Sequence, residues 1–319
     1  MTRKQLLLPT AFSEKWRNNM FLGIDTSCYT TSVAIVSEEG NILADERILL
    51  AVKEGARGLR QSEGVFQHIK NLPDLIEKVK DFLPELKAVA VSAKPRNEEN
   101  SYMPVFLAGK SFARTIASSL GVPLYYTDHQ HGHIMAASKS AEFVPQEKFI
   151  AIHLSGGTTE LLLTDGEHTK IVGRTLDIPA GQLIDRTGVM CGEAFPCGKQ
   201  MDIKKIKTQL KLPVSVKGSN INFSGAEIQA EKLFKEGMEK GEIYTAIFTC
   251  VAKSIEKAVK NLGDYHILPV GGVSSNSILK DYLNEAFKEK IHFANPRYMT
   301  DNAVGTAFIC REKFMGRKL

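Results

Sequence analysis

The sequence contains few cysteines and no long hydrophobic run, and these absences exclude several classes of protein. Its 5 cysteines are odd in number and none belongs to a Cys-x-x-Cys pair, so the sequence indicates neither a disulfide framework nor a zinc knuckle. We expect reduced thiols. The longest apolar runs, such as residues 88–91, fall far short of the roughly 20 residues that cross a bilayer, so we expect no membrane span.

The N-terminus does not have the pattern of a signal peptide. Residues 1–9 contain basic side chains and leucines, but residues 13–17 are polar where a signal peptide would stay apolar. We therefore expect a cytoplasmic protein with an N-terminal extension over residues 1–20.

Neither basic nor acidic residues are in large excess. The chain has 41 basic and 36 acidic residues, a formal net charge of +5 over 319 residues. This balance permits an RNA partner without arguing for one, because an ordinary solvated surface gives the same numbers. The length favours two lobes of roughly 100–200 residues each.

The hydrophobic pattern predicts an α/β protein with an internal duplication. Residues 21–27 and 32–36 read as a strand pair, and residues 149–154 and 160–164 repeat that design around a glycine turn. Helical spacing follows in several segments, with buried strands between them. These segments are residues 60–83, 111–120, 225–236, 243–261 and a terminal helix from about Asp301.

This alternation predicts two similar lobes with a cleft between them, where ligands usually sit. We expect the N-terminal lobe to span residues 21–127 and to be completed by a terminal helix over 301–319. The C-terminal lobe would then span residues 128–300.

The segment Asp128-His129-Gln130-His131-Gly132-His133 follows an apolar strand and precedes an apolar helix. Asp128 is a good helix N-cap, and residues four apart share a helix face, so His129 and His133 can bind one metal ion together. His131 would then point elsewhere. An extended segment would instead place all three histidines on one face, and a helix-capping histidine cluster is the other alternative.

Two aspartates are candidates to complete such a site. Asp301 opens the expected terminal helix, where an N-cap is the plain interpretation and a third metal ligand is the alternative. Asp25 ends the first strand, and its carboxylate could position a metal or a water, or could serve a turn.

Two glycine segments could bind an anion. Ser155-Gly156-Gly157-Thr158-Thr159 lies between two strands and could turn backbone N–H groups toward a phosphate or simply form a tight hairpin. Gly271-Gly272-Val273-Ser274-Ser275-Asn276 follows a strand and is expected to open a helix, where a helix N-terminus favours an anion. The alternative for this segment is a glycine turn needed only for close helix packing.

In this order, these segments resemble the TsaD family of tRNA threonylcarbamoyl transferases, known from older usage as glycoproteases or O-sialoglycoprotein endopeptidases. The resemblance runs from about Phe21 to the C-terminus. It rests on the segments GIDTSC at 23–28, SGG at 155–157, 175–185, FPCG at 195–198, NFSG at 222–225, GGVSSN at 271–276 and TDN at 300–302.

The resemblance implies a two-lobed actin-like ATPase fold of the sugar kinase and Hsp70 kind. It also implies one divalent metal, iron or zinc, held by His129, His133 and Asp301, and ATP, AMP or an adenylate as ligand. The implied nucleotide or substrate contacts are His153, Leu154, Ser155, Gly156, Gly157, Asp185, Gly198, Gly271, Gly272 and Asn276. Asp25, Thr158 and His131 are additional candidates.

The implied reaction moves a threonylcarbamoyl group from an adenylate to the exocyclic amine of a tRNA adenosine beside the anticodon. The implied partners are tRNA, a small paralogue of the transferase and a small ATPase. The resemblance identifies no catalytic side chain.

The chain differs from the family pattern around the expected cleft. His131 replaces a glutamate, Thr158 a histidine and Gln182 another glutamate, Tyr29 and Thr30 replace an acidic pair, and residues 94–96 replace a Gly-Pro-Gly loop. Such neutral replacements change what a site binds. They leave two alternatives open: carbamoyl transfer to an acceptor other than tRNA, or an inactive assembly partner. A zinc-protease function ranks lowest because the histidine segment lacks the glutamate general base.

Overall fold

The computed structural model describes residues 19–27, 29–52, 59–143, 147–165 and 168–317. Most of the expected N-terminal extension, and Cys28 of the first motif, therefore lie outside the described residues. The chain divides into two compact units. The first contains the described residues through His129 together with Asn302–Arg317, and the second contains Gln130–Asp301.

The first unit is built on a five-stranded sheet with the order β3-β2-β1-β4-β5. β1 pairs antiparallel with β2 and parallel with β4, and β4 pairs parallel with β5. Its elements are β1 (Met20–Thr26), β2 (Thr30–Ser37), β3 (Ile42–Leu49), α1 (Gln61–Lys78), the 3₁₀ helix η2 (Lys80–Glu85), β4 (Leu86–Ser92), α2 (Phe106–Leu120), β5 (Leu124–Thr127) and α10 (Val304–Phe314).

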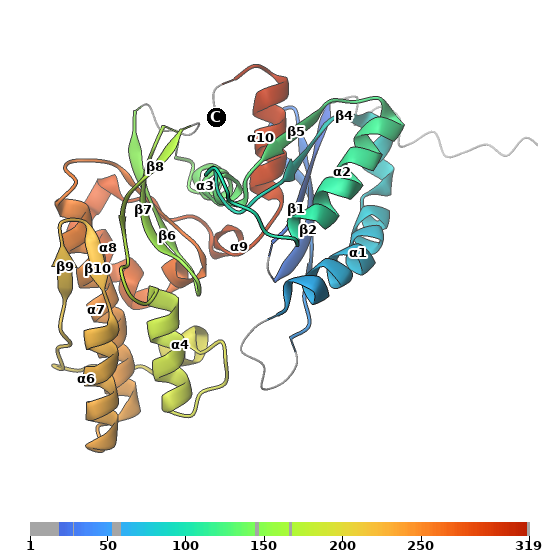
Figure 1. Ribbon diagram of the computed structural model, residues 1–319. Helices are drawn as coiled ribbons and strands as arrows, with labels where there is room; N and C mark the ends of the chain where they lie inside the picture. The colour runs from blue at the N-terminus through green and yellow to red at the C-terminus, as the bar shows by residue number, and fades with distance from the viewer. Residues whose placement is uncertain (1–18, 28, 53–58, 144–146, 166–167, 318–319) are drawn as a thin grey trace, which may run out of the picture. The chain divides into compact units, whose positions relative to one another are not determined.

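Alternating side chains of the central strands are buried on opposite faces of this sheet, as a sheet covered on two sides requires. Leu22 and Ile24 pack in the cluster that contains residues of α1 and α2, whereas Phe21 packs with Cys310 of α10. Figure 1 shows α1 and α2 on one side of this sheet and α10 on the other.

The second unit is built on a four-stranded sheet with the order β11-β6-β7-β8. Its elements are α3 (His129–Ser140, whose first residue belongs to the first unit), β6 (Phe149–Leu154), β7 (Thr159–Thr164), β8 (Thr169–Arg174), α4 (Ala180–Met190), α5 (Gly198–Lys204), β9 (Ser215–Lys217), β10 (Asn220–Asn222), α6 (Ser224–Lys235), α7 (Lys240–Lys260), β11 (Ile267–Val270), η3 (Gly272–Ser275), α8 (Ser277–Phe287), η4 (Lys288–Lys290) and α9 (Pro296–Met299).

The strand pattern of the first unit recurs in the second. β6, β7 and β8 form an antiparallel series, and β11 lies parallel to β6 on the other side, as β4 does beside β1. On one face, Ile150 and Ile152 pack with residues of α4, α6, α7 and α8. On the other face, Phe149 and Ala151 pack with Ile134 and Ala137 of α3. This packing fixes α3, with its histidines, against the sheet.

Two predictions about helix starts are wrong. The terminal helix does not begin at Asp301: α10 begins at Val304, and the Asn302 side chain accepts hydrogen bonds from the N–H groups of Val304 and Gly305. The Gly271-Gly272 segment does not open an α-helix either. It forms the short 3₁₀ helix η3, and α8 begins only at Ser277 with Asn276 as its N-cap.

Candidate metal centre and nucleotide site

Helix α3 carries the histidine pair at its start. The helix begins at His129, whose N–H donates to the carbonyl of Lys94, and His133 follows one turn later. Nearly the whole helix is buried: His133 is 5% exposed, and every residue from Gln130 to Ser138 is buried. Buried histidines at this spacing need polar partners, since a buried ring nitrogen without one is costly.

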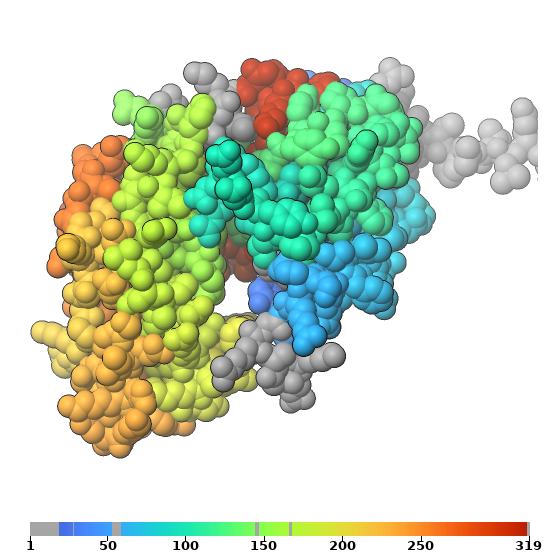
Figure 2. Space-filling model, viewed as in Figure 1, coloured from blue at the N-terminus to red at the C-terminus, as the bar shows by residue number. Residues whose placement is uncertain are grey.

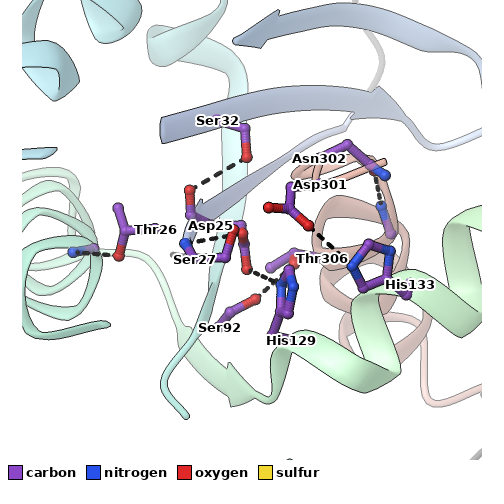
Figure 3. A network of polar contacts seen from close by, with 12 residues as sticks. Asp25, Thr26, Ser27, Ser32, Ser92, His129, His133, Asp301, Asn302 and Thr306 are labelled. Atoms are coloured by element: carbon purple, nitrogen blue, oxygen red, sulfur yellow. Dashed lines mark hydrogen bonds and ion pairs between the residues drawn. The ribbon is translucent and has the colours of Figure 1, made fainter. Parts of the chain in front are cut away.

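Asp301 supplies a carboxylate to this pair. Its Oδ1 lies 3.3 Å from Nε2 of His133 (Figure 3). His129, His133 and Asp301 each offer one ligand atom, and the three atoms lie within 4.8 Å of one another. Among the described residues, no other group of three or more histidine, cysteine or acidic side chains meets that condition.

The chemistry of these donors fits a divalent metal. Two imidazoles and one carboxylate are the donor set of many iron(II) sites and of catalytic zinc sites, which keep further positions open for substrate or water. The 3.3 Å between His133 and Asp301 is about the separation of two ligand atoms that share one tetrahedral ion.

Asp25 lies behind the first histidine. Its carboxylate is 1% exposed, and Oδ1 lies 3.0 Å from Nδ1 of His129 (Figure 3). The other carboxylate oxygen, Oδ2, accepts a hydrogen bond from the N–H of Ser27. A carboxylate in this position holds the proton on Nδ1 and leaves the lone pair on Nε2, the arrangement that orients metal-binding histidines.

His131 has different surroundings. Its Nε2 lies 3.3 Å from the hydroxyl of Thr169 at the start of β8, and the side chain is 9% exposed. It is not part of the three-residue ligand group. The segment forms the start of the α-helix α3, so the helical prediction is confirmed, and His131 points away from the ligand group as that prediction requires.

The segment between β6 and β7 is a hydrogen-bonded turn. The N–H of Ser155 donates to the carbonyl of Thr158, and the Ser155 hydroxyl accepts from the N–H of Thr158. A Cβ added at Gly156 or Gly157 would meet no atom within 4 Å. The tight-hairpin interpretation is thus correct for the backbone, and the glycines leave its outer side open to a ligand.

Helix α4 begins directly against this turn. The N–H of Ala180 donates to the Thr159 hydroxyl, and a Cβ added at Gly181 would lie 2.4 Å from the carbonyl oxygen of Ser155. Only glycine permits this approach. The N-terminus of α4 therefore contributes its positive end to the same place as the turn.

The loop after β11 lies beside the end of β6. Gly271 has a φ of 90°, and a Cβ there would lie 2.3 Å from the carbonyl oxygen of Leu154. Because β11 and β6 are parallel, with Val270 opposite His153, their following loops meet at the same sheet edge. The structure thus brings together His153, Leu154, the turn 155–158, Gly271 and Gly272.

Asn276 follows the Gly271–Ser275 loop, and only one of its two side-chain polar atoms has a hydrogen-bond partner in the described chain. Its Oδ1 accepts from the N–H of Leu279 and caps α8. Within the described chain, its Nδ2 is buried and has no hydrogen-bond partner, and the residue is 7% exposed. A buried amide donor of this kind costs free energy unless a ligand acceptor fills it.

Asp185 and Gly198 are joined through the backbone. The Asp185 carboxylate accepts from the N–H of Cys197, which immediately precedes Gly198 and α5. Burial raises the pKa of Asp185, and this hydrogen bond partly opposes that rise. Asp202 of α5 in turn accepts from the N–H and hydroxyl of Ser277 at the start of α8.

Sequence reasoning missed several polar residues that hold these segments. Asp202 links α5 to α8, and Gln130 donates to Glu160 in a buried pair between α3 and β7. Asp177 accepts from the N–H groups of Ile178, Phe223 and Ser224. An aspartate three residues after a strand could have signalled a loop anchor, but the distant partners of all three residues could not be read from spacing.

No helix in the described ranges is long and apolar enough to cross a membrane.

The fold is that of known nucleotide-binding proteins. The chain is similar to the activator of 2-hydroxyisocaproyl-CoA dehydratase from Clostridium difficile with bound ADPNP (TM-score 0.57, 16% identity, covering 94% of this chain and 96% of that one). It is also similar to a ROK family glucokinase from Streptomyces griseus in complex with glucose and AMPPNP (TM-score 0.50, 12% identity, covering 92% and 100%). These likenesses define an α/β protein with the actin-like ATPase fold.

Sequence comparison gives the family. The profile of TsaD, tRNA N6-adenosine threonylcarbamoyltransferase, matches residues 60–308. A tRNA N6-adenosine threonylcarbamoyltransferase of Neorickettsia sennetsu is 29% identical over 317 residues, covering 93% of this chain and 94% of that protein. The chain belongs to the TsaD family, whose members are transferases of tRNA modification, and the predicted family and fold are confirmed.

Proposed function

We propose that this protein transfers a threonylcarbamoyl group from an adenylate to the exocyclic amine of a tRNA adenosine beside the anticodon. The observation that carries the proposal is the group formed by His129, His133 and Asp301, in a chain whose family is named for that transfer. In the reaction, the amine nitrogen attacks the carbonyl carbon, the bond to the phosphate oxygen breaks, and AMP leaves with the electron pair. The amine loses one proton.

The ends of β6 and β11 are proposed to bind the adenylate. The open side of Gly156 and Gly157 and the N-terminus of α4 favour the phosphate, and the buried Nδ2 of Asn276 offers a donor to a polar ligand atom. Asp185 and Gly198 are proposed to complete the pocket through α5. Holding the donor in one orientation supplies a large part of the rate in a transfer of this kind.

His129, His133 and Asp301 would hold the divalent ion, iron or zinc. A bound ion supplies Lewis-acid stabilisation of charge on phosphate or carbonyl oxygens. Asp25 keeps His129 in the tautomer that presents Nε2, through the 3.0 Å contact with Nδ1.

The test is a reconstituted transfer assay. The protein is mixed with a tRNA transcript and a source of threonylcarbamoyl-adenylate, with and without the implied small paralogue and small ATPase, and the modified nucleoside is measured by mass spectrometry. We expect product with the wild type and none with His133→Ala. His168→Ala is the matched control, because that side chain is 81% exposed and, within the described residues, forms an ion pair only with Asp165.

Several results would decide against the proposal. Unchanged metal content in His129→Ala and His133→Ala would remove the metal centre. Nucleotide binding without tRNA modification would favour carbamoyl transfer to another acceptor. No transfer to any acceptor, with His131→Glu restoring it, would identify an inactive assembly partner.

A further inference from the structure

β5 forms one edge of the sheet in the first unit, and basic residues surround it. Figure 1 shows β5 with α10 on one side and α2 on the other. Lys110 and Arg114 lie one turn apart on α2, Lys313 lies on α10, and Arg317 follows it. Lys110 is half-buried, and the other three are exposed.

An exposed aromatic ring lies among these cations. Tyr126 of β5 is 49% exposed. The Lys110 ammonium lies over its ring at 5.7 Å from the centroid, and Lys313 Nζ donates to the Tyr126 carbonyl at 3.0 Å. The two lysines thus approach one tyrosine from helices on opposite faces of the sheet, and Tyr126 is held in place with much of its ring open to solvent.

Exposed carboxylates are missing from these three elements. α2 and β5 contain no acidic residue, and Glu312, the acidic residue of α10, is 4% exposed and ion-paired with Arg311. Within the described residues, Lys110, Arg114, Lys313 and Arg317 take part in no ion pair with a carboxylate. Lys232 and Lys235 of α6, by contrast, pair with Glu236 and Glu231.

The exposed face of α2 also consists mainly of small polar side chains. Ser111, Thr115, Ser118 and Ser119 are exposed beside Arg114, with leucines exposed only near the two ends of the helix. Hydroxyl and basic side chains are the groups that contact nucleic acid phosphates, and an aromatic ring flanked by cations is a surface on which a base can stack. A hydrophobic protein interface would have larger apolar side chains at its centre.

We propose that Tyr126, Lys110, Arg114 and Lys313 form a contact surface for RNA, and that the RNA is the tRNA acceptor. We call these four residues the β5 edge surface. The cations bind the phosphate backbone, and the tyrosine ring stacks on an unpaired base. This inference rests on the proposed function and adds the location of the RNA contact.

The experiment measures binding of a fluorescently labelled tRNA transcript by anisotropy over a series of salt concentrations. We expect Lys110→Ala/Arg114→Ala to weaken binding about tenfold and to lower the slope of log K against log salt by about one to two, because two phosphate contacts are lost. Tyr126→Ala should weaken binding about tenfold with no change of slope, and Tyr126→Phe should bind as the wild type does.

The matched control is Lys232→Ala/Lys235→Ala, which removes the same two charges from α6. Circular dichroism and thermal melting establish that each variant is folded. If the control loses as much tRNA affinity as Lys110→Ala/Arg114→Ala, the RNA does not bind at the β5 edge surface. The same conclusion follows if Lys110→Ala/Arg114→Ala and Tyr126→Ala both bind tRNA as the wild type does. If the wild type modifies tRNA while these variants bind normally, only the β5 edge surface is wrong. If the wild type binds no tRNA, the proposed function fails with it.

Discussion

Asp25 and His129 lie 104 residues apart in the sequence, and their side chains meet at 3.0 Å between Oδ1 and Nδ1. Asp25 is the penultimate residue of β1, and His129 begins α3. The carboxylate is buried, and its second oxygen is held by the N–H of Ser27, so its orientation is fixed before any metal binds. This contact makes Asp25 a positioning residue for a metal ligand.

Asp25→Asn should weaken metal binding without removing any ligand. An amide of the same shape no longer holds the proton on Nδ1 with a negative charge, and changes of this kind reduce metal affinity by about 10- to 100-fold. Competition with a chromophoric chelator measures the affinity. Asp45→Asn, which breaks an ion pair with Arg47 elsewhere in the same sheet, is the control. Equal metal affinity in Asp25→Asn and wild type would contradict the positioning role.

Asp301 and Asn302 should separate metal binding from stability. Asn302→Ala removes the side chain that accepts from the N–H groups of Val304 and Gly305, and should lower the free energy of unfolding by about 1 kcal/mol. Asp301→Ala should leave that cap intact and abolish stoichiometric metal binding. Urea denaturation and metal analysis of both variants check this. A stability loss confined to Asp301→Ala would reverse the two assignments.

Two substitutions at Asn276 should separate its two roles. Asn276→Asp keeps an acceptor for the N–H of Leu279 but loses the buried Nδ2 donor and adds a negative charge. We expect AMP affinity to fall at least tenfold by calorimetry, with little change in melting temperature. Asn276→Ala should lose nucleotide affinity and also about 1 kcal/mol of stability, because the cap is lost. Normal AMP binding by Asn276→Asp would exclude the donor role.

Asp177 should contribute a pH-dependent part of the stability. Burial acts to raise the pKa of this carboxyl, but hydrogen bonds from Phe223, Ser224 and Ile178 prevail and lower it from 3.8 to about 2. A lowered native pKa stabilises the fold above the unfolded value, and this stabilisation is lost as the pH falls from about 4 to about 2.

The magnitude is limited by solvent, because Asp177 is exposed. After allowance for screening, we expect about 1 kcal/mol at pH 7, measured as the difference in unfolding free energy between the wild type and Asp177→Asn. The difference should shrink at pH 3. A difference that does not change between pH 7 and pH 3 would show that the carboxylate charge is not the cause.

The hydrophobic pattern predicted the apolar strands of both sheets well and the strands with polar residues poorly. β1, β2, β4, β5, β6, β7 and β11 follow apolar runs, and all were expected. β3 and β8 were missed because their half-exposed positions carry residues such as Asp45, Glu46 and Lys170. The edge strands β5 and β11 were found because their sequences are mostly apolar. An edge strand that is open to solvent, as β3 and β8 are, can have a sequence that resembles that of a loop.

The polar sites show a similar division. The spacing of His129 and His133 indicated a shared helix face, because that relation is local. The sequence could not distinguish a capping role from a ligand role for Asp301, since the capping contact depends on where α10 begins and is made by Asn302. Helices α4 and α5 were not predicted, although α4 meets the turn at Ser155 through a glycine and a threonine hydroxyl. Such contacts depend on the packed chain.

The repeated strand pattern places Phe21–Ser27 in the first unit where Phe149–Ser155 stands in the second, and Asp25 then corresponds to His153. In each copy this position is the penultimate residue of a central strand, with a parallel neighbour on one side. A duplicated strand end gives evolution two independent places to change a polar side chain. Under the proposed function, one copy of this position orients His129 through Asp25 and the other contacts the nucleotide through His153, so a single strand geometry serves two different ligands.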